Sequence, residues 1–187
     1  MLIRISALLI LTFFYLIYLG KAWLLKKQGI KVNLLGDKQS SSEKYFEIVL
    51  RVMTGFGALI RFLAPFMFAV NQTDWRYAGL VLTFLGVLLF FISVKTMGIN
   101  WRAGFNEQQR TELVTTGIYR FSRNPAFVAF DLLYLGFALI FPNVLMIVMA
   151  MLALFLFDWQ IRGEENYLIA FFGERYRNYQ KAVRRYL

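Results

Sequence analysis

The sequence contains no cysteine and no histidine among its 187 residues. Without cysteine, the chain can form no disulfide, no thiolate nucleophile and no cysteine-ligated metal site. Without histidine, it also lacks the usual ligands of zinc and iron sites, and it cannot build a serine–histidine–aspartate triad. The inventory therefore excludes these metal-dependent and histidine-dependent chemistries, and we expect no bound metal.

Charged residues are also scarce, because they make up 17% of the chain whereas soluble domains carry about a quarter. Hydrophobic residues make up 59% and come in long blocks, which is typical of a small polytopic membrane protein with one domain. The net charge is +10, and the basic residues lie between the blocks. This arrangement indicates that the basic residues set the orientation of the chain in the membrane and contact anionic lipid headgroups. It argues against nucleic acid as a partner.

Five stretches are long and apolar enough to cross a bilayer as helices, a task that takes about 20 residues. The predicted spans run near 5–24, 48–70, 77–97, 125–141 and 144–159. Only the turn signal Pro142-Asn143 separates the last two, so we expect a tight antiparallel hairpin. The predicted fold class is an all-α membrane protein with five transmembrane helices and an amphipathic C-terminal helix.

The distribution of lysine and arginine predicts the orientation. These residues gather between spans one and two, between spans three and four, and after span five, whereas the opposite side holds only Arg4 and Arg76. The positive-inside rule then predicts an outside N-terminus and a cytoplasmic C-terminus. We expect residues 1–98 to supply three membrane helices. Residues 99–187 should supply a ligand-binding loop, the hairpin and the tail of one integral domain, and the small size fits a bacterial inner membrane.

The segment GIYRFSRNPAFVAF, residues 117–130, leads into the fourth span. Pro125 suits the first turn of a helix, and Asn124 then stands in the N-cap position, where its side chain can accept a backbone N–H. One interpretation is simply a well-capped membrane helix. The other is a helix start that holds the polar groups of a ligand, with Tyr119, Phe121 and Phe127 as aromatic walls. These rings also suit an ordinary interfacial belt.

In the tail, we expect Gly163 to end the fifth helix and Glu164-Glu165 to open an amphipathic one. The basic residues of this tail are expected to face lipid headgroups: Arg175, Arg177, Arg184 and Arg185. Glu164 and Glu165 do not fit a helix that binds headgroups, because they would lie beside a negatively charged leaflet. They suggest a specific partner.

Asp131 lies inside the fourth span, where a carboxylate is costly unless it is paired or functional. The candidate partners are Arg51, Arg61, Lys95 and a cationic ligand. A structural salt bridge and a functional site both remain open on this pattern.

These residues, in this order, resemble the isoprenylcysteine carboxyl methyltransferase family and its phospholipid methyltransferase relatives. The resemblance covers about residues 100–185, and its parts are Gly117-Ile118-Tyr119, Arg123-Asn124-Pro125-Ala126-Phe127, Glu164-Glu165-Asn166-Tyr167-Leu168 and Phe172-Gly173-Glu174-Arg175-Tyr176-Arg177-Asn178-Tyr179. It implies an integral membrane enzyme that transfers a methyl group from S-adenosylmethionine to a lipophilic acceptor.

The resemblance also implies where the site lies. The cofactor is expected in a cytoplasmic pocket made by the loop before the fourth span, the start of that helix and the tail. The implied cofactor contacts are Leu113, Val114, Tyr119, Asn124, Pro125, Ala126 and Phe127. The catalytic candidates are Glu164, Arg123 and Gln160, and the substrate-binding candidates are Arg162 and Asp131.

Three positions depart from the family pattern. Asn124 stands where the family more often has histidine, and Phe127 replaces a tyrosine. Asparagine can serve at its position if that position acts through the backbone or a capping amide. Gln160 stands where we expect a family arginine that holds a carboxylate substrate. Arg162 can take over that role only if the helix ends differently, so this departure bears on the acceptor more than on methyl transfer.

The identity of the acceptor stays open at this stage. A carboxylate acceptor needs no general base, which suits a chain without histidine. A lipid amine such as phosphatidylethanolamine needs deprotonation, and the nearby candidate bases are Glu107, Asp131 and Glu164. Sterol reductases are similar in their C-terminal half but use a reduced nicotinamide and have longer chains. A non-enzymatic membrane assembly subunit is the remaining alternative.

Overall fold

The computed structural model describes residues 1–30, 41–69, 73–101 and 112–186. The regular elements of this part are all helical, which confirms the predicted all-α class. They are α1 (Leu2–Lys27), α2 (Ser41–Met67), α3 (Asp74–Met97), α4 (Pro125–Ile140), α5 (Val144–Phe172) and α6 (Glu174–Ala182), with the 3-10 turns η1 (Gly98–Asn100) and η2 (Gly117–Arg120).

Four of these helices are long and apolar enough to cross a membrane: α1, α2, α3 and α5. The apolar helix α4 has only 16 residues. At 1.5 Å per residue it is about 24 Å long, which is less than the ~30 Å hydrocarbon core of a bilayer. The five predicted spans therefore correspond to four long helices and one short helix. The side of the membrane on which each end lies stays a prediction.

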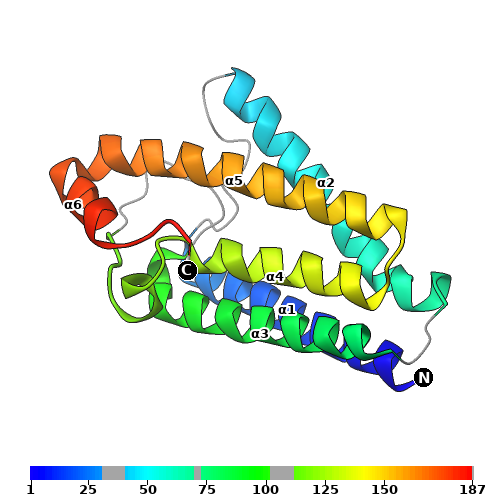
Figure 1. Cartoon of the computed structure of the whole chain (residues 1–187). Helices are drawn as coiled ribbons and strands as arrows, with labels where there is room; N and C mark the ends of the chain where they lie inside the picture. Colours follow the sequence, from blue (N-terminus) through cyan, green and yellow to red (C-terminus); the bar gives the residue numbers. More distant parts are fainter. Residues whose placement is uncertain (31–40, 70–72, 102–111, 187) are drawn as a thin grey trace.

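Small residues bring α3 and α4 into close antiparallel contact, side by side in Figure 1. A Cβ atom at Gly79 would lie 2.8 Å from the carbonyl oxygen of Gly136, and one at Gly86 would lie 2.9 Å from that of Ala129. A larger side chain would push the helices apart. Small residues permit this approach between membrane helices, and it fixes the start of α4 beside the end of α3.

Aromatic rings fill the space between the helices. Phe90 of α3 lies between Phe14 of α1 and Phe130 of α4, with ring centroids 4.8 and 5.3 Å apart respectively. Phe130 also contacts Phe157 of α5, at 5.5 Å, and Phe127, at 6.0 Å. This continuous packing holds the α4–α5 hairpin against the first helices and places Phe127 near the end of the bundle where α4 begins.

The hairpin has the turn that the sequence predicts. Helix α4 ends at Ile140, whose carbonyl accepts a 2.6 Å hydrogen bond from Nη1 of the buried Arg76. Asn143 caps α5, because its Oδ1 accepts a hydrogen bond of 3.1 Å from the Met146 N–H. The helices α4 and α5 then run antiparallel (Figure 1).

The predicted helix break at Gly163 is wrong. Helix α5 continues to Phe172, and the chain breaks at Gly173, which adopts a φ of +58°. A glycine inside a helix costs only about 1 kcal/mol, and the buried face made by Phe157, Ile161 and Glu165 keeps α5 continuous. The two acids therefore lie inside α5. The amphipathic helix predicted in the tail is the shorter α6, which buries Tyr176 and Tyr179.

Candidate functional site

The segment before α4 is anchored to the end of α3 by a glycine. Gly117 has a φ of +59°, and a Cβ atom there would lie 2.8 Å from Cγ2 of Thr96. Only glycine combines this backbone with this close approach without strain. The following turn η2 buries Tyr119 and leaves Phe121 exposed.

A buried carboxylate joins the segment before α4 to α5 and to the tail. The Oε1 atom of Glu165 accepts hydrogen bonds from Nε and Nη2 of Arg123, at 3.1 and 2.7 Å. Its Oε2 atom accepts hydrogen bonds from Nε and Nη2 of Arg185, at 3.0 and 2.7 Å. We call Arg123, Glu165 and Arg185 the carboxylate clasp. The Glu165 side chain is only 4% exposed, and four charge-assisted bonds are the compensation that such burial requires.

Arg123 also holds the tail through its remaining donors. Its Nη1 atom donates to the carbonyl of Val183, at 2.5 Å, and to that of Gln180, at 3.2 Å. Its backbone N–H donates to the carbonyl of Arg184, at 2.9 Å, and Ser122 pairs with Arg184 as an isolated parallel bridge. The tail therefore runs back from α6 to the start of α4, as Figure 1 shows.

Asn124 stands in the N-cap position of α4, as predicted, but its side chain accepts no hydrogen bond from a backbone N–H of the helix, so the predicted side-chain cap is wrong. The side-chain amide instead donates from Nδ2 to the carbonyl of Arg185, at 3.2 Å. The backbone carbonyl of Asn124 accepts the N–H groups of Phe127 and Val128, and Pro125 occupies the first helical position as predicted. The amide faces the returning tail because the tail covers the helix start. A side-chain donor at this position thus holds the tail in place.

Two buried tyrosines connect η2 with α6. The hydroxyl of Tyr179 donates to the carbonyl of Tyr119, at 2.6 Å. Burial raises the pKa of Tyr179 to about 12, although the nearby Arg123 opposes this shift. Burial also raises the pKa of Tyr119 well above its ordinary value, with smaller contributions from Tyr179 and the negative charge of Glu164. Glu164 therefore lies close enough to η2 for its charge to act on the Tyr119 phenol, and both phenols stay protonated near neutral pH.

Gln160 pairs with a neighbour on its own helix. Its Nε2 atom donates to Oε1 of Glu164, at 2.9 Å, and the residue is only 4% exposed. Arg162 lies on another face of α5, where its 60% exposed side chain pairs with Asp158 at 2.6 Å. Because α5 does not end at Gly163, the condition under which Arg162 could replace the missing family arginine is not met. The hydroxyl of Tyr186 donates to the other oxygen of Asp158, at 2.6 Å, and fixes the tail on this face.

The carboxyl group of Asp131 has one buried oxygen atom. Its Oδ1 atom has no hydrogen-bond partner among the residues that the structure describes. Arg61, one of the predicted partners, instead donates to the hydroxyl of Tyr15, at 3.2 Å, and lies 3.9 Å from the ring centroid of Tyr134. Burial and the hydrogen bond to Asp158 raise the pKa of Tyr186, and the charges of Asp158 and Asp131 add to this effect, so Asp131 lies within electrostatic range of the tail.

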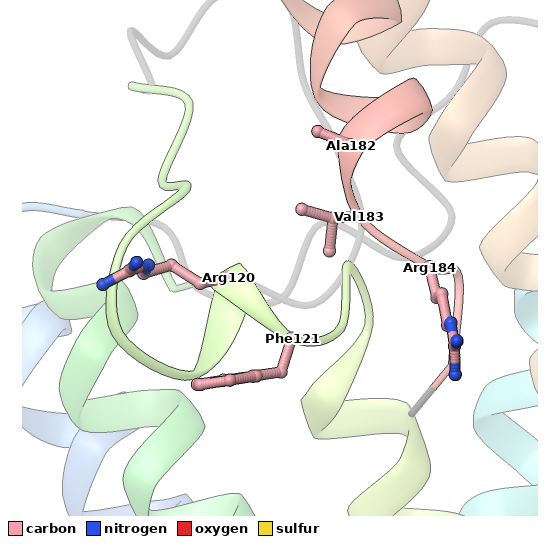
Figure 2. Close-up of a pocket in the computed structure, with 5 residues that line it drawn as sticks. All are labelled: Arg120, Phe121, Ala182, Val183 and Arg184. Atoms are coloured by element: carbon pink, nitrogen blue, oxygen red, sulfur yellow. The ribbon is translucent and has the colours of Figure 1, made fainter.

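The predicted cofactor contacts lie along the chain from the extended stretch before η2 to the first turn of α4. Tyr119, Asn124 and Pro125 are buried, and the others are half-buried: Leu113, Val114, Ala126 and Phe127. Glu107, a candidate base, lies outside the described residues. A separate cavity of about 330 Å³ lies between η2 and the tail, and its described lining includes none of these contacts: Arg120, Phe121, Ala182, Val183 and Arg184 (Figure 2).

The carboxylate clasp was not predicted from the sequence. The prediction that Arg185 faces headgroups is wrong, because Arg185 binds Glu165, and Glu165 is not among the candidate site residues given above. One signal was available, because Glu165 follows Phe157 and Ile161 at four-residue intervals and so lies on the same helix face. A glutamate on a buried face needs a cation, and Arg123 and Arg185 are that partner.

The chain is similar to known proteins over this region. The family model described as phospholipid methyltransferase matches residues 75–175, which includes η2, α4, α5 and two of the three clasp residues. Proteins named protein-S-isoprenylcysteine O-methyltransferase are 29% identical over 110 residues in Dictyostelium discoideum (57% of this chain, 46% of the relative) and 32% identical over 125 residues in Schizosaccharomyces pombe (65% and 51%). A probable protein-S-isoprenylcysteine O-methyltransferase of Oryza sativa subsp. indica is 31% identical over 135 residues, 68% of this chain and 70% of the relative. The chain spans about half the length of the first two relatives.

Proposed function

Because the chain belongs to the phospholipid methyltransferase family, we propose that it transfers a methyl group from S-adenosylmethionine to a lipophilic acceptor at the membrane. The favoured acceptor is a carboxylate of the isoprenylcysteine type, the substrate named for the relatives. The proposed site lies at the membrane face that carries the basic loops, which the positive-inside rule makes the cytoplasmic one.

One observation carries this proposal: the two segments that resemble the family meet in space. Residues 117–127 and the Glu164-Glu165 pair are far apart in the sequence, yet Arg123 and Glu165 bind each other directly. A bare bundle of membrane helices does not need a buried ion pair at this position. A pocket that must hold a polar ligand at the edge of a bilayer does need an ordered loop, and the carboxylate clasp provides that order.

The residues around η2 and α5 suit the cofactor. When bound, S-adenosylmethionine supplies an activated methyl group on a cationic sulfonium. The half-buried Glu164 contributes a negative charge in the vicinity of Tyr119, and a negative charge favours a cation. Half-buried apolar side chains at Leu113, Val114 and Phe127 can pack against the nucleoside.

The proposed role of the protein is positioning and exclusion of water. An anionic acceptor and a cationic donor lose their charges as the methyl group moves, and a water-poor site favours that step. The ring of Phe127, packed on Phe130 and Phe157, supplies an apolar wall. The clasp holds the loop and tail in one arrangement, which contributes the orientation of the two reactants. A carboxylate acceptor then needs no general base.

A lipid amine is the second candidate acceptor, and one observation favours it. The buried Oδ1 atom of Asp131, which has no hydrogen-bond partner among the described residues, suits an ammonium group better than a carboxylate. Gln160 also favours an amine over a carboxylate. Its side-chain amide already donates a hydrogen bond to Glu164, at the position where the family arginine is expected to hold a carboxylate substrate. An amine must lose a proton before it is methylated, and Asp131 or Glu164 would have to accept that proton.

Two experiments test the proposal. Calorimetry of the purified protein with S-adenosylhomocysteine should show micromolar binding, and a nicotinamide dinucleotide should not bind. Binding of neither ligand would support the assembly-subunit alternative, and binding of the dinucleotide alone would support a reductase. Radiolabelled methyl transfer into a lipid extract, followed by treatment with base, then identifies the acceptor. A methyl ester releases volatile label under base, whereas an N-methyl group retains it.

A further inference from the structure

An arginine inside the second membrane helix has no place in the proposed methyl transfer. Arg61 lies in α2, within the stretch Lys44–Met67 that is long and apolar enough to cross a membrane. The helix ends six residues later, about 9 Å along its axis. Arg61 is only 4% exposed, and a buried arginine in a membrane helix is typically paired or marks the path of a ligand.

The guanidinium group of Arg61 is only partly satisfied by the protein. Its Nη2 atom donates to the hydroxyl of Tyr15 in α1, at 3.2 Å. Its Nε and Nη1 atoms are buried and have no hydrogen-bond partner among the residues that the structure describes, and none of those residues offers it a carboxylate. A buried positive charge with unpaired N–H groups is unfavourable, so this position favours a ligand that brings an anionic oxygen.

Two tyrosines from other helices place hydroxyl groups beside this arginine. The guanidinium carbon of Arg61 lies 3.9 Å from the ring centroid of Tyr134 in α4. The Tyr134 hydroxyl is buried, and no described residue forms a hydrogen bond with it. A Cβ atom at Gly57 would lie 2.5 Å from that hydroxyl, so a glycine of α2 leaves room for it. The Tyr15 hydroxyl accepts from Arg61 and keeps its own proton to donate.

The rings on the α1 side of Arg61 are open to the bilayer in part. Tyr15, which binds Arg61, is half-buried, and its ring centroid lies 5.5 Å from that of Phe62, which is also half-buried. Exposed leucines follow or precede these rings along the two helices: Leu16, Leu59 and Leu63. A molecule dissolved in the bilayer can therefore reach Arg61 by moving aromatic side chains alone, while its apolar body stays against leucine.

The chemistry at Arg61 selects one class of ligand. A guanidinium group with phenol donors beside it suits an oxyanion, and the depth in the membrane requires that the rest of the molecule is apolar. A carboxylate is small and ends its molecule, whereas a phosphodiester would carry further polar groups into the bundle. We propose that Arg61, together with the hydroxyls of Tyr15 and Tyr134, binds the carboxylate of a long-chain carboxylic acid that enters from the bilayer between α1 and α2.

This site is separate from the one proposed for methyl transfer. Tyr134 follows Pro125 by nine residues, which is about 14 Å along α4. A carboxylate held at Arg61 is therefore too far from the start of α4 to receive a methyl group there. The inference requires neither the cofactor nor an acceptor.

Equilibrium binding of radiolabelled oleate to the full chain in uncharged detergent tests the proposal. We expect saturable binding at one site, and R61Q should weaken it at least tenfold, whereas R61K should recover part of the affinity. The control is R177Q, because the Arg177 side chain is 57% exposed and pairs with Glu174 on α6. Oleate should raise the unfolding temperature of the wild type and of R177Q but not that of R61Q, and the unfolding transition of R61Q without oleate shows that this variant is folded.

Two results would overturn the proposal. If R61Q and R177Q bind oleate with equal affinity, the acid binds elsewhere, for example at the acceptor site. If methyl oleate, which has the same chain without the charge, competes as well as oleate does, the protein offers only an apolar surface. Both measurements are made without S-adenosylmethionine, so failure here and failure of the proposed function are distinguishable.

Discussion

Arg123, one residue before the N-cap of α4, and Glu165, 42 residues later in α5, are joined by hydrogen bonds of 3.1 and 2.7 Å. Arg185 binds the opposite oxygen of the same carboxylate. The buried Glu165 therefore connects the segment before α4, the hairpin and the tail through its two oxygens.

Replacement of Glu165 by glutamine should destabilise the protein strongly. The substitution leaves the buried Arg123 without a counter-charge, and breaking a buried ion pair in this way costs about 3–5 kcal/mol. We expect a lower unfolding temperature in detergent, measured by scanning fluorimetry. The control is Glu174→Gln, because the Glu174 side chain is 70% exposed and its pair with Arg177 should contribute little. Equal unfolding temperatures for the two variants would contradict a structural role for the clasp.

Replacement of Glu164 by glutamine should lower the rate of methyl transfer and leave the stability of the protein almost unchanged. The side chain is half-buried and the change keeps its size, so we expect the unfolding temperature to change little. Turnover should fall ten- to hundredfold, which corresponds to roughly 1.4–2.7 kcal/mol of transition-state stabilisation. Radiolabelled methyl transfer measures the rate, and Glu174→Gln again serves as the control. An unchanged rate would remove Glu164 from the proposed site.

Asn124→Ala should loosen the tail. It removes the hydrogen bond from the amide to the carbonyl of Arg185, which then keeps only the 3.4 Å hydrogen bond from the Ser122 hydroxyl, at a cost of about 1 kcal/mol. Proteolysis near the tail, followed over time, should be faster in this variant. Asn124→His restores a side-chain donor and should recover resistance. If alanine is as resistant as asparagine, the amide does not hold the tail.

Gly117→Ala should distort the loop before α4. The new Cβ atom would meet Thr96 at 2.8 Å, and the backbone φ of +59° is strained for alanine, so we expect a loss of about 1–3 kcal/mol. Affinity for S-adenosylhomocysteine, measured by calorimetry, should fall with it. Gly20→Ala is the matched control, because a Cβ atom there meets nothing within 4 Å. The control should unfold at or above the wild-type temperature.

Much of the fold was predictable because it depends on local signals. The long apolar runs identified the helices, Pro125 marked the first turn of α4, and Pro142-Asn143 marked the hairpin turn. The end of α5 was not predictable in this way. Gly163 and Gly173 are both helix-weakening glycines, and only tertiary packing around Phe157 and Glu165 decides which of the two ends the helix.

The site was predicted in part, for a similar reason. The resemblance brought Tyr119 and Glu164 into one proposal, and the charge of Glu164 adds to the effect of burial and of Tyr179 in raising the pKa of Tyr119. The role of the tail could not be read from local patterns. An arginine that faces headgroups and an arginine that binds a buried carboxylate have the same sequence signature, and Arg185 becomes distinct only when the path of the chain after α6 is known.

The order of the clasp residues along the chain also has a consequence for biosynthesis. Arg123 is synthesised before Glu165, so the carboxylate can meet one cation soon after α5 forms. Arg185 follows twenty residues later, and the fourfold coordination of Glu165 waits until that stretch has left the ribosome. A nascent chain arrested just after α5 would therefore contain the α4–α5 hairpin without the tail that covers the start of α4, and the docking of the tail is the step that completes the carboxylate clasp.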